Sequence, residues 1–220
     1  MKHFSVDPEL EKNSFFIADL ELSKLYIKDD KDLLRYTAKK IKSEESADIY
    51  CIIAEIEIYG YLKKNGIKFE CLIHKKQNDK TPDFIILTNN KNIFVEVTTL
   101  DIVKNVKNDN HISKTLKNKL PEEFEQLNSE DKNIVIIKLY NWDTWYSGIK
   151  DMGKKYSKKY YFSLRNCLRG YINRSEGLLT SGNYRWINAV VGYGSSIYSN
   201  KYRYTHRSPK IPFNEEEKRI

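Results

Sequence analysis

Gly66 separates two hydrophobic periods in the first half of the chain. Before it, residues 46–65 repeat apolar side chains at helical spacing, and Gly66 is well placed as the left-handed residue that ends a helix. After it, apolar and polar residues alternate over 67–74, which indicates a strand. The sequence therefore predicts a helix that leads directly into sheet strands.

The next segments predict a hairpin and a crossover. Residues 83–88 and 93–100 have the pattern of two strands, and the polar residues 89–92 between them are typical of a hairpin turn. Residues 111–128 have helical spacing, with Pro121 inside the pattern, so they form either one kinked helix or two short ones.

An apolar strand is predicted at 133–140. A hairpin followed by a helical crossover and another strand gives an α/β fold, with a mixed sheet of about five strands flanked by helices. Outer elements are expected as follows: helical or irregular cover over 1–30, helices at 31–43 and 158–172, and a last strand at 185–193.

The positive charge is concentrated late in the chain. The 220 residues carry a net charge of +8, yet residues 150–210 hold 13 Lys and Arg against 2 acidic residues, and residues 1–149 sum to −2. Nine of the 16 tyrosines fall in that basic segment. This excess favours a polyanionic partner. We divide the chain into an N-terminal helical cover (1–45), a core (46–149) and a basic, tyrosine-rich part (150–220) that completes the sheet.

Several protein classes are disfavoured. No apolar run approaches the roughly 18 residues that span a bilayer, and the first residues lack the apolar core of a signal peptide. Three scattered cysteines, Cys51, Cys71 and Cys167, form neither a zinc pattern nor a disulfide framework. They fit a reducing compartment, so we expect a cytoplasmic protein without a membrane partner.

Three carboxylates are hard to explain by folding alone. Glu96 interrupts an apolar strand, Asp83 opens another after Pro82, and Glu55 lies in an apolar helical stretch. A carboxylate in such surroundings costs several kcal/mol unless it is paired or binds a metal. The predicted hairpin brings Asp83 and Glu96 near each other. Oxygen ligands of this kind suit Mg²⁺, which also binds waters and phosphate.

The order of these residues resembles the PD-(D/E)xK nuclease superfamily, whose fold is restriction-endonuclease-like. Pro82-Asp83 matches the first half of the motif, and Glu96-Val97-Thr98 matches the second half thirteen residues later. The helical stretch AEIEIYGYLKKNG resembles the glutamate-bearing helix of the Holliday-junction-resolvase-like branch, with Glu55, or alternatively Glu57, as its carboxylate. The resemblance covers residues 54–100 and extends more loosely to residue 140.

The resemblance implies a metal-dependent endonuclease that hydrolyses phosphodiester bonds, with DNA as the expected substrate, in restriction, defence, recombination or repair. Asp83, Glu96 and the Val97 carbonyl would hold Mg²⁺, or Mn²⁺ in its place, and Glu55 a second metal or a metal-bound water. Gln126 corresponds to a glutamine that recurs in some branches. Analogy also suggests a homodimer. The alternatives are an RNA-cleaving enzyme with the same site and an inactive nucleic-acid-binding or assembly subunit.

Thr98 departs from the family pattern, which has a lysine there. A threonine cannot act as a cation. Three explanations are open: a lysine of the next helix replaces it, the metal alone activates the water, or the site is inactive. The candidate lysines are Lys114, Lys117 and Lys119.

Two further expectations concern side-chain placement. Glu55 and Glu57 lie about 200° apart on a helix, so we expect one of them to be solvated. In the basic segment, cations interleaved with tyrosines suit phosphate contacts and base stacking. The residues expected to bind nucleic acid are Lys154, Lys155, Lys158, Lys159, Arg165, Arg169, Arg174, Arg185, Lys201 and Arg203.

Overall fold

Six strands form one mixed sheet whose spatial order follows the chain, β1-β2-β3-β4-β5-β6. Their bounds are β1 (Phe69–Cys71), β2 (Phe84–Ile86), β3 (Ile93–Asp101), β4 (Lys132–Tyr140), β5 (Ile187–Tyr193) and β6 (Lys201–Thr205). The computed structural model describes residues 14–43, 46–73, 81–101, 118–125, 127–140, 179, 184–193 and 201–219. All other residues lie outside the described ranges, among them 74–80, 102–117, 126 and 141–178, and with them the helix expected at 158–172.

The predicted α/β architecture with a mixed sheet is confirmed. Strands β1, β2 and β3 are antiparallel neighbours, β3, β4 and β5 run parallel, and β6 returns antiparallel to β5. The sheet has six strands rather than about five, because residues 201–205 form a strand where only a basic surface was expected. The two strands after residue 150 complete the sheet.

Within the described residues, three helices precede the sheet: α2 (Ser14–Ile27), α3 (Lys31–Ser43) and α4 (Ser46–Lys64). The predicted end of α4 is confirmed. Gly66 has a φ of 67°, and its N–H donates to the Lys63 carbonyl at 3.2 Å while the Ile67 N–H donates to the Leu62 carbonyl at 3.1 Å. This pair of bonds is the Schellman arrangement, which satisfies carbonyls at a helix end.

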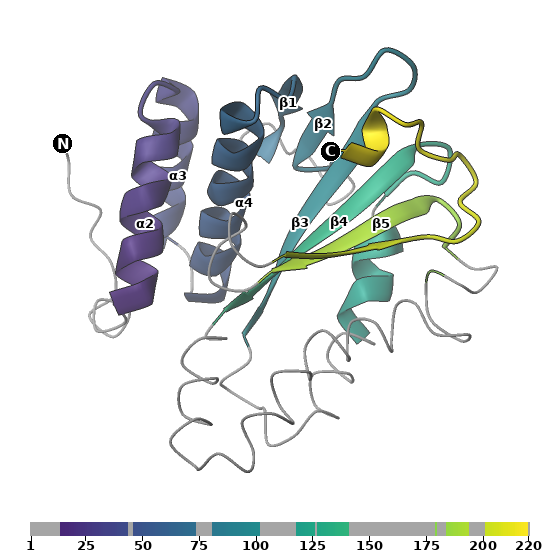
Figure 1. Ribbon diagram of the computed structural model, residues 1–220. Coiled ribbons are helices and arrows are strands. Elements are labelled where there is room, and N and C mark those ends of the chain that lie inside the picture. The colour runs from purple at the N-terminus through teal and green to yellow at the C-terminus, as the bar shows by residue number, and fades with distance from the viewer. Residues whose placement is uncertain are drawn as a thin grey trace, which may run out of the picture.

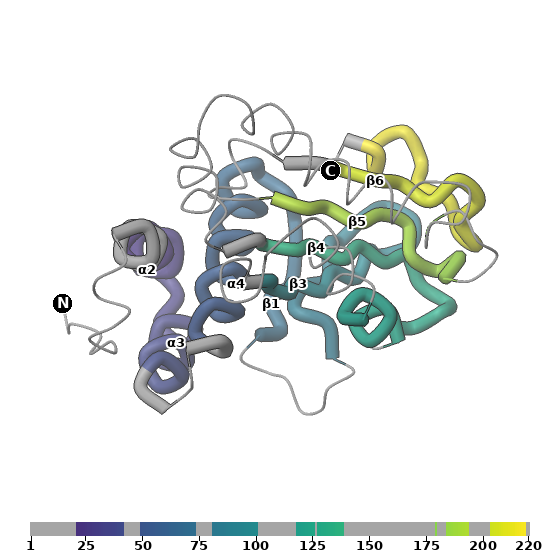
Figure 2. The backbone as a smooth tube through the Cα atoms, turned by 90° about the horizontal axis from the view of Figure 1, so that it is seen from below, coloured from purple at the N-terminus to yellow at the C-terminus, as the bar shows by residue number. Residues whose placement is uncertain are grey.

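Helices lie on both sides of the sheet. Figure 1 shows α4 beside the sheet, with α2 and α3 stacked beyond it, and a further helix over 118–125 behind the strands. Figure 2 shows α2 and α3 outside α4 and the 118–125 helix beside the parallel strands. The sheet is therefore sandwiched between α4 and a smaller helix.

Alternating residues of the strands make a core on each face. Ile93, Val95 and Val97 of β3 belong to the main buried cluster together with apolar residues of α4. Successive side chains in a strand point to opposite faces. In β4, Ile134 and Ile136 belong to the same cluster. Val135 and Ile137, which alternate with them, are fully buried on the other face of the sheet, and so is Phe124 of the 118–125 helix.

Two contacts fix α4 against its neighbouring helices. A Cβ built on Gly60 would lie 2.2 Å from the Tyr26 ring of α2, so the two helices approach closely. Asp30 caps α3 by accepting from the Leu33 N–H at 3.0 Å. The Tyr59 hydroxyl donates to the other oxygen of Asp30 at 3.3 Å, and burial beside that charge raises the pKa of Tyr59 to about 12.

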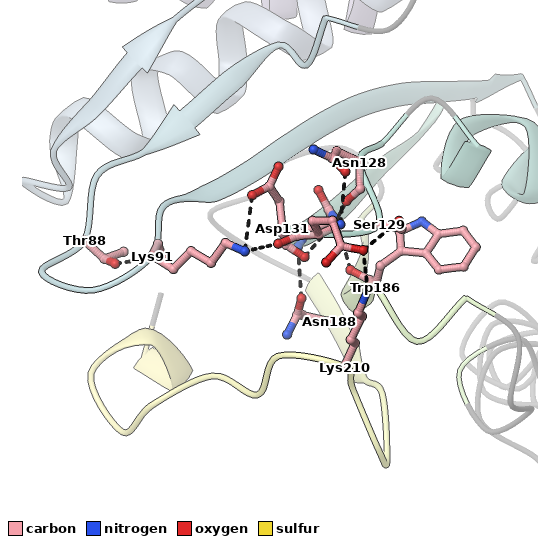
Figure 3. A network of polar contacts seen from close by, with 10 residues as sticks. Thr88, Lys91, Asn128, Ser129, Asp131, Trp186, Asn188 and Lys210 are labelled. Carbon is pink, nitrogen blue, oxygen red and sulfur yellow. Dashed lines mark hydrogen bonds and ion pairs between the residues drawn. The ribbon is translucent and has the colours of Figure 1, made fainter.

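The segment after β6 packs at the amino-terminal end of β4. Lys132 and Glu217 form an ion pair there, with the lysine Nζ at 2.6 and 2.7 Å from the two carboxylate oxygens. Their side chains are 5% and 1% exposed. A polar network lies near the same end (Figure 3), where the Thr88 hydroxyl donates to the Lys91 carbonyl at 2.9 Å and Lys91 Nζ lies 3.6 Å from Asp131 Oδ1. Nearby, the Asn133 N–H donates to Asn188 Oδ1 at 2.9 Å and the Trp186 indole donates to the Phe124 carbonyl at 3.1 Å.

Candidate metal site

Asp83 and Glu96 lie side by side across β2 and β3. The register pairs Phe84 with Val95, and the Asp83 N–H donates to the Val95 carbonyl at 3.0 Å, so the residue before β2 stands opposite Glu96. The Val97 N–H donates to Asp83 Oδ2 at 2.7 Å. Both carboxyl-bearing residues are buried, Asp83 at 0% and Glu96 at 5% exposure. The predicted proximity of Asp83 and Glu96 is therefore confirmed.

Thr98 lies on the same face of β3 as Glu96, because side chains two residues apart in a strand share a face. Its hydroxyl donates to Glu123 Oε1 at 2.8 Å, which also shows that this face is the one covered by the 118–125 helix. Glu123 was not among the residues singled out from sequence. The helix thus brings another carboxylate to the place where the family motif carries its lysine.

Lys119 is the one candidate lysine within the described residues, since Lys114 and Lys117 lie outside them. Its Nζ donates to the Thr99 carbonyl at 3.0 Å and lies 4.0 Å from the Glu123 carboxylate. The side chain is 34% exposed, so the cation also reaches solvent. Lys119 of the 118–125 helix is therefore bound to the carbonyl of Thr99, the residue that follows Thr98. Gln126 lies outside the described residues.

Glu55 and Glu57 occupy the two flanks of the α4 surface that faces the sheet. On one flank, Cys51, one helical turn before Glu55, shares a hydrogen bond with Thr99 of β3 at 3.0 Å. On the other, Glu57 accepts from Lys138 Nζ of β4 at 2.8 Å and from the Tyr193 hydroxyl of β5 at 3.2 Å. Glu55 thus lies on the β3 side, and Glu57 is committed to the opposite side.

The expectation that one of these two glutamates is solvated is wrong. Glu55 is 9% and Glu57 is 3% exposed. The 200° separation was correct, but a helix packed between a sheet and other helices buries both flanks of its inner surface. Lys138 was not singled out from the sequence, although it interrupts an apolar strand in the same way as Glu96 does.

Electrostatic effects on two cysteines show how the acids are distributed. Burial raises the pKa of Cys71 to about 12, with smaller contributions from Asp30, Glu55 and Asp83. Burial also raises the pKa of Cys51, which is further affected by Thr99, Lys119, Glu55 and Glu123. The Glu55 charge contributes to raising the pKa of both thiols. Both thiols are protonated at neutral pH, which makes them poor nucleophiles.

A partly hydrated Mg²⁺ fits the donor set of this site. Within the described ranges, no three His, Cys, Asp or Glu side chains converge closely enough to hold a metal ion together. Mg²⁺ commonly uses one or two carboxylates and keeps several waters. Asp83 and Glu96, with the adjoining Val97 carbonyl, can supply that smaller set.

Three of the residues expected to bind nucleic acid are described. Arg185 is exposed, and its Nε donates to the Ser208 carbonyl at 3.0 Å. Arg203, on β6, donates from Nη1 to the Lys218 carbonyl at 2.9 Å and lies 5.4 Å from the Phe213 ring centroid. Burial lowers the pKa of Arg203. Lys201 opens β6. The other seven lie outside the described residues: Lys154, Lys155, Lys158, Lys159, Arg165, Arg169 and Arg174.

Comparisons with protein-family models, curated proteins and solved structures found no match to this chain. Among the helices that the structure describes, none combines the length and apolar character needed to cross a membrane.

Proposed function

We propose that this chain is a metal-dependent endonuclease that hydrolyses phosphodiester bonds, with DNA as its expected substrate. One observation carries the proposal: Asp83 and Glu96 are both buried, and Asp83, directly before β2, stands opposite Glu96 of β3 and accepts from the Val97 N–H at 2.7 Å. Two adjacent buried carboxylates are costly unless a cation compensates their charge. Glu55 is also buried, but it belongs to α4, which packs on the face of the sheet opposite to that of Glu96.

Asp83, Glu96 and the Val97 carbonyl would hold Mg²⁺, which would supply positive charge to a scissile phosphate and would favour deprotonation of a water. The chain's own residues do the rest. The backbone bond to Asp83 fixes that carboxylate against β3. Lys119, held by the Thr99 carbonyl, adds a positive charge beside the site. The basic residues after 149 favour a polyanion through phosphate contacts, which carry little sequence information.

The test is a cleavage assay on plasmid DNA and on a mixed-sequence RNA, with Mg²⁺, Mn²⁺ or EDTA. Asp83→Asn and Glu96→Gln keep the side-chain shape while removing charge, and the matched control is Glu70→Gln, an exposed acid on β1. We expect wild type and control to cleave DNA only with metal, and both site variants to lose at least about 10³-fold in rate, as removal of an essential electrostatic group does.

Two results bear on the alternatives. Metal-dependent cleavage of RNA but not DNA would replace the substrate and keep the site. No cleavage of either nucleic acid by wild type with either metal would refute the endonuclease. If wild type and both variants then still bound nucleic acid in a salt-sensitive way, the chain would be a catalytically inactive nucleic-acid-binding subunit.

A further inference from the structure

We propose that Glu123 is the general base of this site and that Thr98 is the residue that positions it, an inference that rests on the proposed endonuclease function. The starting observation is the 2.8 Å hydrogen bond from the Thr98 hydroxyl to Glu123 Oε1. This bond joins β3 to the 118–125 helix across the face of the sheet that also carries Glu96. The resemblance to the nuclease family assigns no role to Glu123.

The location of the pair makes it suited to water activation. Thr98 lies two residues beyond Glu96, so its side chain is the next one along the same face of the strand. A threonine there supplies no positive charge, but it can hold a carboxylate in one orientation. A carboxylate has about four acceptor sites, and the bond from Thr98 to Oε1 orients Glu123 while using one of them.

The surroundings of Glu123 combine this carboxylate with a cation. Lys119, one turn earlier on the same helix, places Nζ 4.0 Å from the Glu123 carboxylate and 3.0 Å from the Thr99 carbonyl. On α4, the Glu123 charge acts on Cys51 together with those of Glu55 and Lys119. The two tasks of the missing motif lysine are thus divided: Glu123 takes a proton, and Lys119 supplies positive charge.

The proposed step balances as follows. The oxygen of a water attacks the phosphorus, and a proton of that water passes to Glu123 Oε2. The bond from phosphorus to the leaving oxygen breaks, its electron pair stays on that oxygen, and the oxygen takes a proton from solvent water. Glu123 then releases its proton to solvent and is ready for the next turnover. A positioned base of this kind typically contributes 10²–10⁴-fold to a rate.

The experiment compares Glu123→Gln with Glu122→Gln, an exposed glutamate on the same helix. Single-turnover cleavage rates are measured with Mn²⁺, and Mn²⁺ affinity is measured separately by calorimetry on each folded variant. We expect Glu123→Gln to lose about 10²–10³-fold in rate and Glu122→Gln less than about twofold. Both should bind Mn²⁺ within about threefold of wild type, whereas Asp83→Asn should bind it at least about tenfold more weakly.

Two further variants separate the base from its support. Thr98→Val removes the hydroxyl at constant volume and should slow cleavage about tenfold or more, while Thr98→Ser keeps the donor and should stay within about threefold. Sodium formate supplies a small carboxylate in place of the deleted one, so it should accelerate Glu123→Ala at least about tenfold and leave Asp83→Asn unchanged. Rescue of that kind is not expected of a residue with a merely structural role.

Defined results would overturn the proposal. If Glu123→Gln cleaves as fast as Glu122→Gln, or if formate does not accelerate Glu123→Ala, Glu123 is not the base. If Glu123→Gln weakens Mn²⁺ binding as much as Asp83→Asn does, Glu123 is a metal ligand instead. Each of these results leaves the endonuclease standing. A wild-type protein that cleaves no nucleic acid with either metal would overturn both proposals.

Discussion

Two buried groups of charged side chains lie at different positions along the parallel strands, and their acids have different kinds of hydrogen-bond partner. Near the amino-terminal end of β4, both oxygens of Glu217 contact the Lys132 ammonium at 2.6 and 2.7 Å. The second group lies farther along the sheet, around Glu96 of β3. There the Val97 N–H donates to Asp83, and the Thr98 hydroxyl donates to Glu123.

The difference suggests what each group is for. A carboxylate that meets a lysine directly is compensated inside the fold, and breaking the pair exposes an uncompensated charge. Around Glu96, Asp83 accepts from a main-chain N–H, and Glu123 accepts from a hydroxyl and lies 4.0 Å from the partly exposed Lys119. Acids gathered in this way concentrate negative charge at one place, which is what a cation site requires. Glu57 with Lys138 belongs to the first kind, since their side-chain atoms are 2.8 Å apart and both are buried. The following predictions test this contrast, from the largest expected effect to the smallest.

Lys132→Met should destabilise the fold by about 3–5 kcal/mol, because it leaves the Glu217 charge buried without its partner. Urea unfolding measures the effect. The matched control is Lys218→Met, whose ion pair with Glu215 is exposed and whose loss should change stability by under about 0.5 kcal/mol. Metal-dependent cleavage by folded Lys132→Met should equal that of wild type. Equal stabilities of the two variants would contradict the structural role of the buried pair.

Mn²⁺ should stabilise wild type by about 2.7 kcal/mol at a concentration 100 times its dissociation constant, because the ion binds only the folded chain. The same concentration should not stabilise Asp83→Asn or Glu96→Gln. In EDTA all three proteins should unfold within about 1 kcal/mol of one another, since the amides keep shape and the Asp83 acceptor. Thermal unfolding with and without metal decides this. A full metal response in either variant would place the cation elsewhere.

Lys119→Met should slow single-turnover cleavage about tenfold and change stability by under about 0.5 kcal/mol. The side chain is 34% exposed, so its charge matters more to the developing phosphate charge than to folding. Lys68→Met, at an exposed position before β1, is the control. Unchanged rates after single replacement of Lys114, Lys117 and Lys119 by Met would reject the idea that a helix lysine replaces the missing one.

Acid should weaken the Lys132–Glu217 end of the sheet in particular. Burial tends to raise the pKa of Glu217, but the bonds from Lys132 and the Asn214 N–H outweigh it and hold that pKa below its usual value. A lowered carboxyl pKa gives stability that is complete above the unfolded-state pKa and is lost as pH falls through the folded-state pKa. Urea unfolding between pH 6 and pH 3 should therefore show a steeper loss for wild type than for Glu217→Gln. Identical acid profiles would show that Glu217 does not contribute.

Much of the fold could be predicted because local sequence determines it. Gly66 ends α4 as expected, since few residues other than glycine adopt its φ of 67°, and the predicted hairpin brings Asp83 to Glu96. β6 was missed because its alternating Lys, Tyr and Arg residues suit both a strand and a nucleic-acid surface. Composition alone does not separate the two.

The parts of the site that escaped prediction depend on contacts between distant segments. Glu123 lies in a surface-like run of acids, Glu122, Glu123 and Glu125, and only the packing of its helix selects one of them for Thr98. Lys138 and Glu57 are 81 positions apart in the sequence, and they meet only because α4 packs on β4. Helical periodicity gives the angle between two side chains, but it does not say how many sides of the helix are covered.

The close approach of α2 and α4 has a consequence for how sequences of this type can diverge. Position 60 can accept a methyl group only if the aromatic ring at position 26 is displaced, since the two would be 2.2 Å apart. Substitutions at these two positions should therefore be correlated: where position 60 gains a side chain, position 26 should become small. A library randomised at both positions and selected for folding would reveal that exchange directly, and it would show that helix spacing here is encoded by one pair of residues.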